Sequence, residues 1–385
     1  MGTDWFWVVF DTSQYAKYYG DVHDLLALPA GTTLKYDYAE TEFSSSALHR
    51  VPDPGAPVLF VYTQYEVAYS RERGESKPSA KVEGVAYVGT RLGRIQAVTK
   101  NGKRYNLDFT VEGYPNQGEH LESILKQLAG HGETPLAKNA EGVEFRKYVC
   151  VSTNTAALKQ LEAPDEQLAW AAIVTALSTP PMQFSSDTFW RLVGPFTKRK
   201  GKVLRPELDK HMTDGKVTAV ESVYNVSHGT TLRFDFVSKL GAGGGQPQNA
   251  QVDVQSTEND IARVVGASQI QLRRYTARHF EVRGYSASAF DQSKADIRLN
   301  TSPQQSDGWP SGPSIHMAVR VSGNKWRTCF GIAFGIAGVV AYGIGDSKAA
   351  DTWGGWATTL KIVGILLVVL SGQLISGDLS FSVDN

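Results

Sequence analysis

Two long apolar runs near the C-terminus constrain this chain more than any other feature. The first extends from Thr328 to Gly345 without a charged residue, and the second extends from Ala357 to Ser376 with Lys361 as its one charge. Each approaches the roughly 20 residues that a helix needs to cross a bilayer, and a helix pairs its own backbone polar groups, as hydrocarbon demands. The sequence therefore predicts a transmembrane helical hairpin over residues 327–377. A helical hairpin buried in a soluble domain is the alternative.

Basic residues flank the hairpin on one side. Arg320, Lys325 and Arg327 precede the first run, whereas the connecting segment has Lys348 beside two aspartates. Cationic flanks stay in the cytoplasm, so we expect the residues before the hairpin and the tail, 378–385, to be cytoplasmic. The first ten residues are acidic and do not have the features of a signal peptide.

Charge is distributed unevenly along a chain whose net charge is zero. Residues 1–184 contain 17 basic and 22 acidic side chains, and residues 185–327 contain 20 and 13. The basic half precedes the predicted membrane hairpin. It fits attraction to an anionic inner leaflet or to an anionic ligand such as nucleic acid.

An internal echo indicates two related units in the soluble part. Gly31-Thr-Thr-Leu-Lys-Tyr-Asp-Tyr38 returns as Gly229-Thr-Thr-Leu-Arg-Phe-Asp-Phe236, and Phe109-Thr-Val-Glu-Gly-Tyr114 returns as Phe280-Glu-Val-Arg-Gly-Tyr285. Such repeats indicate duplicated units, although alternating strands can resemble one another by chance. Apolar and polar residues alternate in these segments, as they do in half-buried strands.

Many other short alternating runs, separated by turn residues, predict a mainly β (α+β) chain with two related β-rich modules, each a sandwich or small barrel. Helices are expected at 116–130 and 164–178, where apolar residues recur at helical spacing. The predicted organisation is a β-rich module with a helix (1–163), a helical connector (164–184), a second and basic β-rich module (185–303), a tether with the last strand (304–326), the hairpin (327–377) and the tail.

No pattern typical of a catalytic or metal site is present. None of the eight histidines forms a close pair with metal-ligand spacing, and the two cysteines, Cys150 and Cys329, cannot supply a cysteine-rich centre. Nucleophile-elbow and phosphate-loop motifs are also absent from the sequence. We therefore expect a protein that is not an enzyme and has no cofactor or metal.

Two basic segments of the second module are the candidate ligand-binding residues. Arginine interleaved with aromatic residues can follow a phosphate backbone and stack bases, as in oligonucleotide-binding barrels; a solvated surface or a phospholipid-binding patch is the alternative. The candidates are Lys198, Arg199, Lys200, Lys202, Arg205, Arg273, Arg274, Tyr275, Arg278 and Arg283.

Small and polar residues stand out in the predicted hairpin. Gly331, Gly335 and Gly338 form a stripe that lets helices approach closely, either within one hairpin or between subunits. Three residues of the second run, Lys361, Ser371 and Gln373, are unusual in lipid. Lys361 either reaches the outer interface or faces a water-filled path in an oligomer.

The layout of β-rich modules, a short tether and a membrane hairpin resembles the bacterial membrane effectors of anti-phage defence, in particular Hailong-type ion-channel effectors. The resemblance covers the whole chain and depends on layout. It implies a homo-oligomer, most simply a tetramer, with a gated pore in the bacterial inner membrane. It also implies that cytoplasmic modules hold a short single-stranded DNA or nucleotide signal made by a partner nucleotidyltransferase, and that opening depolarises the cell in abortive infection.

A second interpretation is a membrane-anchored binding or adaptor module without a pore. Residues 54–67, Pro54-Gly-Ala-Pro-Val-Leu-Phe-Val-Tyr-Thr-Gln-Tyr-Glu-Val67, resemble the β-rich GIDE domain of membrane-bound ubiquitin-ligase-like proteins. The cysteine set of a RING domain is missing, so this resemblance does not imply ligase activity. A membrane-tethered hydrolase is a third class.

Overall fold

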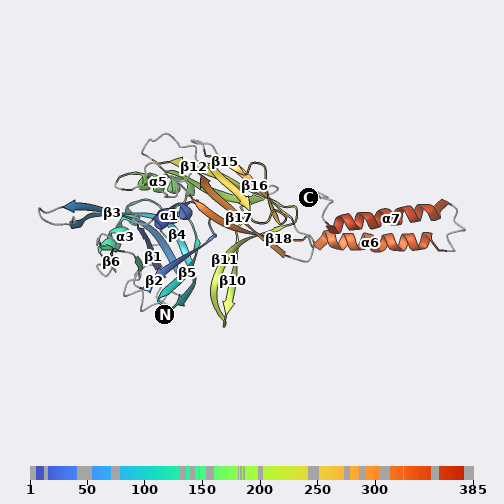
Figure 1. Ribbon diagram of the computed structural model, residues 1–385, viewed down its shortest axis with the longest axis horizontal. Helices are drawn as coiled ribbons and strands as arrows, with labels where there is room; N and C mark the ends of the chain where they lie inside the picture. The colour runs from blue at the N-terminus through green and yellow to red at the C-terminus, as the bar shows by residue number, and fades with distance from the viewer. Residues whose placement is uncertain are drawn as a thin grey trace.

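The computed structural model describes residues 6–12, 16–40, 54–70, 79–130, 136–138, 144–146, 148–152, 160–180, 182, 184, 187–197, 203–241, 251–272, 278–285, 292–302, 313–323, 325–347 and 355–376. Figure 1 shows a β-rich body with a pair of helices extending from one end. The chain is therefore mainly β, as its alternating runs predicted.

The N-terminal half forms one six-stranded sheet. Its neighbours are antiparallel except for β1 and β3, which run parallel. In order across the sheet, the strands are β2 (Thr33–Ala39), β5 (Arg104–Val111), β4 (Ser79–Asn101), β3 (Pro57–Ser70), β1 (Phe6–Thr12) and β8 (Tyr148–Ser152). A separate two-stranded sheet contains β6 (Leu136–Lys138) and β7 (Glu144–Arg146).

The second half forms two sheets, and the larger of them contains the strand that leads to the hairpin. In order, its strands are β10 (Glu207–Thr213), β11 (Lys216–Ser227), β18 (Ser314–Ser322), β17 (Gln292–Ser302), β13 (Gln251–Ser256) and β15 (Gln269–Gln271). The smaller sheet contains β14 (Ala262–Val265), β16 (Arg278–Gly284), β12 (Thr231–Leu240) and β9 (Thr188–Thr197).

The two echoed sequence pairs occupy similar positions. In each half the first echoed segment (β2 or β12) pairs antiparallel with the second (β5 or β16). Gly31 and Gly229, which precede β2 and β12, both have positive φ, 91° and 76°. Glycine adopts this conformation without steric cost. The strand register differs between the two halves. Thr33 lies opposite Thr110, whereas its counterpart Thr231 lies opposite Arg283, two residues beyond the counterpart of Thr110.

One continuous apolar core joins the halves on either side of the predicted connector. It includes Tyr36 and Phe109 from the first sheet and Trp190, Phe234 and Val319 from the second half. Polar contacts reinforce this junction. Ser222 of β11 accepts the Thr33 backbone N–H at 2.9 Å, and the backbone N–H of Val220 donates to Asp108 at 2.7 Å.

Three helices pack against the body. α3 (Glu119–Gly130) and α5 (Glu166–Ser178) lie within the helical spans expected from sequence, and Asp165 caps α5 by accepting the Gln167 backbone N–H at 2.9 Å. The third, α1 (Ala16–Ala27), was not expected. Its His23 is fully buried and lies 2.7 Å from Asp187, so the helix joins the two halves.

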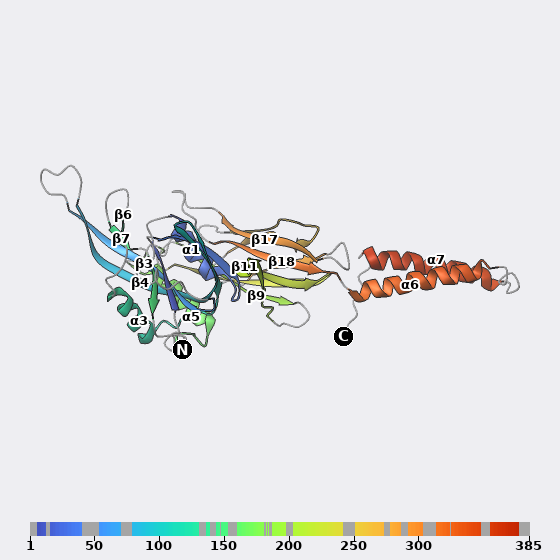
Figure 2. The same ribbon diagram turned by 90° about the horizontal axis from the view of Figure 1, so that it is seen from below.

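The last strand is integral to the larger sheet of the second half. β18 lies between β11 and β17 and pairs with both. It ends at Ser322, and α6 (Lys325–Gly345) begins three residues later. Residues 304–312 of the expected tether lie outside the described residues. The central strand β18 leads almost directly into the hairpin. α7 (Gly355–Ser376) completes that hairpin, and Figure 2 shows both helices extending away from the body.

Candidate functional site

Close packing between α6 and α7 occurs along the predicted glycine stripe. Gly331 and Gly338 are buried in the hairpin. A Cβ atom added to Gly338 would lie 2.7 Å from the carbonyl oxygen of Gly364 on α7, and one added to Gly335 would lie 2.9 Å from the hydroxyl of Ser371. The stripe therefore brings the backbones of the two helices of one hairpin together, because glycine leaves no side chain between them.

The outer surface of the hairpin is apolar around most of its circumference. Ile336 and Val339 of α6 are 62% and 65% exposed, and Leu366 and Val369 of α7 are 56% and 51% exposed. The part of α7 from Gly355 to Gln373 is long and apolar enough to span a membrane; the apolar part of α6, Cys329–Gly345, is shorter. At 1.5 Å per residue this shorter part extends about 26 Å, close to the roughly 30 Å thickness of the hydrocarbon region.

The three polar residues noted in the second run differ in environment. Lys361 lies near the far end of the hairpin, where its Nζ is 2.7 Å from Asp346 Oδ1. Ser371 is buried against Gly335, and Gln373 is exposed. Among the described hairpin residues, these side chains do not form a continuous polar face.

Most of the predicted basic clusters lie outside the described residues. These are Lys198, Arg199, Lys200, Lys202, Arg273, Arg274 and Tyr275. Arg205 and Arg278 are described and exposed, and Arg283 is half-buried on β16.

Arg283 belongs to a cluster that we call the junction patch, formed by Arg263, Arg283, Tyr285 and His228. Arg263 of β14 lies directly opposite Arg283 of β16. The guanidinium carbons of Arg263 and Arg283 are 5.4 and 5.6 Å from the centre of the Tyr285 ring, and the ring of His228 meets Tyr285 edge-on at 6.1 Å. Cations at this range are attracted to an aromatic ring. The buried Nε of Arg283 has no hydrogen-bond partner within the described part of the chain.

The junction patch adjoins the end of β18. The backbone N–H of His228 donates to the Ser322 carbonyl at 2.8 Å, and a Cβ atom on Gly284 would lie 3.0 Å from Val321. Both contacts involve the last two residues of the strand that precedes α6. The sequence did not single out Arg263, because only the pairing of β14 with β16 brings it beside Arg283.

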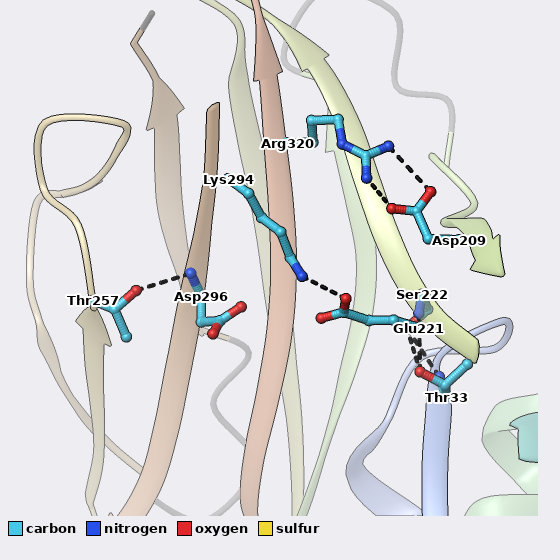
Figure 3. Close-up of polar contacts among 8 residues, drawn as sticks. All are labelled: Thr33, Asp209, Glu221, Ser222, Thr257, Lys294, Asp296 and Arg320. Atoms are coloured by element: carbon cyan, nitrogen blue, oxygen red, sulfur yellow. Dashed lines mark hydrogen bonds and ion pairs between the residues drawn. The ribbon is translucent and has the colours of Figure 1, made fainter. Parts of the chain in front are cut away.

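Ion pairs hold β18 and its neighbours in place. Figure 3 shows Arg320 of β18 forming a two-bond ion pair with Asp209 of β10, and Lys294 of β17 paired with Glu221 of β11 at 2.5 Å. It also shows the contact of Thr33 with Ser222. Strands on both sides of β18 are therefore connected by side chains as well as by the backbone.

Asp24 connects α1 to the start of β18 and has a strongly raised pKa. Its Oδ1 accepts the Ser314 backbone N–H at 2.8 Å. Burial raises the pKa of the carboxyl from 3.8 to about 8; the Ser314 hydrogen bond opposes this shift, and the charge of Asp21 adds to it.

The parent chain is expected to lose folding stability as pH rises from about 4 to about 8, and Asp24→Asn should remove this loss. The unfolded chain releases the Asp24 proton above about pH 4, whereas the folded chain keeps it until about pH 8, so rising pH favours unfolding over this range. Asparagine keeps an oxygen acceptor for Ser314 and does not titrate. Thermal unfolding from pH 4 to pH 9 should show the variant gaining on the parent as pH rises; a constant difference would contradict this assignment.

Comparisons with known proteins do not assign this chain to a class. No protein-family model matches it, and no curated protein matches its sequence. Among solved structures it is similar to the VesB protease of Vibrio cholerae, at 10% identity over 62% of this chain and 82% of the protease, with a TM-score of 0.18. A likeness this low supports no conclusion about fold or activity.

Proposed function

We propose that this protein is a membrane effector. The helical hairpin crosses the bilayer, the β-rich body binds a phosphate-bearing signal on the cytoplasmic side, and several copies assemble into a gated pore. The apolar outer surface of the hairpin carries the membrane part of this proposal, because water does not favour two adjacent helices with exposed apolar side chains over their length.

Direct connection of a central strand to α6 supports control by the body. β18 is hydrogen-bonded on both sides, and few residues separate it from α6. A shift of β18 would therefore be transmitted to the membrane helix, whereas a flexible tether would absorb it. This observation favours an effector over a passive anchor.

The junction patch is the proposed signal site. Two arginines on one tyrosine can pair with phosphate groups and stack on a base, and the patch adjoins the last residues of β18. A short single-stranded DNA or nucleotide bound there would contact the strand that leads to the hairpin.

Arg263→Gln with Arg283→Gln should weaken binding of short single-stranded DNA and reduce its salt dependence. The logarithm of the binding constant falls linearly with the logarithm of the salt concentration, and losing two phosphate contacts makes this slope shallower by about 1.4. Fluorescence anisotropy at several salt concentrations measures both quantities, with Arg104→Gln, an exposed position paired with Asp37, as the matched control. Unchanged DNA binding would exclude the patch as the signal site. Loss of binding to anionic vesicles alone would instead identify a lipid-binding surface.

A pore requires several hairpins, and the exposed small residues of α6 offer a subunit contact. Ala333 and Ala337 are exposed in the single chain, on a different face from the glycine stripe. We expect expression of the full chain to depolarise bacteria, as reported by a potential-sensitive dye, and Ala337→Leu to reduce both depolarisation and oligomer size in detergent. A chain that inserts into the membrane, stays monomeric and leaves the potential unchanged would instead be a membrane-anchored adaptor. That second candidate is favoured because the polar side chains among the described hairpin residues do not form a continuous face that could line a pore.

A further inference from the structure

Two arginines that do not belong to the junction patch are buried where the two halves of the body meet. Arg91 on β4 is 1% exposed and Arg191 on β9 is 6% exposed. Arginine is rarely buried to this extent without a compensating anion. Their burial therefore requires an explanation in terms of partners.

Both guanidinium groups lie near the same aromatic ring. The guanidinium carbon of Arg91 is 3.8 Å from the centre of the Tyr114 ring and that of Arg191 is 5.4 Å from it. Arg191 is also 5.7 Å from the Trp170 ring of α5. The aromatic rings attract both cations, but two like charges in one buried region repel each other.

Several donors in this cluster are unsatisfied. Arg91 Nε donates to the Glu112 carbonyl at 2.8 Å. Three other buried nitrogen atoms, Arg91 Nη1, Arg191 Nε and Trp170 Nε1, have no hydrogen-bond partner in the segments that the structure describes. Buried donors without a partner are rare in native proteins, because an acceptor of the protein or an ordered water normally binds each of them.

The described carboxylate that pairs with the cluster is poorly placed to neutralise it. Glu166, at the start of α5, has its Oε2 atom 3.6 Å from Arg191 Nη1, which is longer than a normal hydrogen bond. Its side chain is 54% exposed. Burial lowers the pKa of Arg91. Electrostatic interaction and a hydrogen bond with Tyr114, together with the charge of Glu166, oppose this shift, and the charge of Arg191 adds to it.

We propose that Arg91, Arg191 and Trp170 form a second anion site, which takes a phosphate group that enters beside Glu166. Guanidinium groups match phosphate oxygens in geometry, and the indole N–H is an additional donor. The bound phosphate displaces the Glu166 carboxylate from Arg191. Since the three residues come from β4, β9 and α5, an occupied site holds the two halves and the predicted connector together.

Phosphate binding by the purified full-length chain tests this site. The measurements use the Arg263→Gln, Arg283→Gln background, which removes the junction patch, and compare thermal unfolding with inorganic phosphate against sodium chloride at equal ionic strength. We expect phosphate to raise the unfolding temperature, and Glu166→Gln to tighten phosphate binding about fivefold because a competing exposed carboxylate is removed. Glu119→Gln, at the start of α3, is the matched control and should change nothing.

Two further variants separate the site from a general charge effect. Trp170→Phe removes the indole N–H and keeps most of the apolar bulk, so phosphate binding should weaken about fivefold. Arg191→Gln should abolish it. Phosphate that stabilises the chain no more than chloride does, in both the parent and Glu166→Gln, would overturn the proposal even if Arg191→Gln failed to fold. Loss of DNA binding at the junction patch would leave this result unaffected.

Discussion

Replacing Leu366 and Val369 with arginine is expected to release the full-length protein from membranes during carbonate extraction. Both side chains lie on the outer surface of α7 near its centre, 56% and 51% exposed, so their replacement does not disturb the contact with α6. Each arginine at the middle of a membrane helix costs about 2.5–3.5 kcal/mol on an insertion scale. Together they disfavour insertion by roughly a thousand-fold or more.

The measurement is the distribution of the protein between pellet and supernatant. Leu366→Ala with Val369→Ala should stay in the pellet, because alanine is tolerated in lipid. Leu168→Arg, at a residue of the body that is 69% exposed, should also stay there. A parent chain found in the supernatant, or a double-arginine variant that remains in the pellet, would contradict a membrane-spanning hairpin.

Gly338→Leu is expected to separate α6 from α7. Its Cβ would lie 2.7 Å from the Gly364 carbonyl oxygen and 3.0 Å from the Leu367 Cβ, so the backbones must move apart. Overpacking of this kind costs about 1–3 kcal/mol or more. Gly343→Leu is the matched control, because no heavy atom lies within 4 Å of a Cβ added at Gly343.

Disulfide formation between α6 and α7 reports this contact directly. A Cβ atom on Gly335 would lie 3.5 Å from the Ser371 Cβ, within the range of about 3.5–4.5 Å seen in disulfides. With Cys150 and Cys329 replaced by serine, Gly335→Cys and Ser371→Cys should therefore crosslink within one chain, and added Gly338→Leu should prevent this. Crosslinked dimers would mean instead that the glycine stripe joins subunits.

Local alternation predicted the strands well where one face meets the core. In β2, Tyr36 and Tyr38 are buried while Lys35 and Asp37 are exposed, as their alternation indicates. The equivalent Phe234 and Phe236 of β12 are also buried. A period of two residues decides which side chain faces the core, so it can be recognised without knowing the neighbouring strands.

Local patterns did not predict α1 or the parallel strand pairs. α1 buries the polar residue His23, and this burial depends on a contact with Asp187 far along the chain. A polar residue on the buried face interrupts the apolar spacing by which a helix is recognised in a sequence. The pairing of β11 with β18 joins segments separated by most of the second half. Such pairing depends on which surfaces meet after the chain has collapsed, and short segments carry little information about it.

The candidate sites also contain residues that local patterns singled out and residues that they missed. Arg283 attracted attention as part of a basic and aromatic run, whereas Arg263 and the buried pair Arg91 and Arg191 did not. Each of these missed arginines is a single cation in an ordinary strand sequence. They became candidates when strand pairing placed them on Tyr285 or Tyr114.

The sequence by itself determined the alternating strands, the echoed pairs and the apolar helices, because each follows from the periodicity of neighbouring residues. Only the tertiary structure decided that one core joins the two halves and that a central strand leads into α6. It also decided that the glycine stripe is occupied by α7 of the same chain. These features depend on contacts between distant segments, whose energies are set by shape and burial after folding.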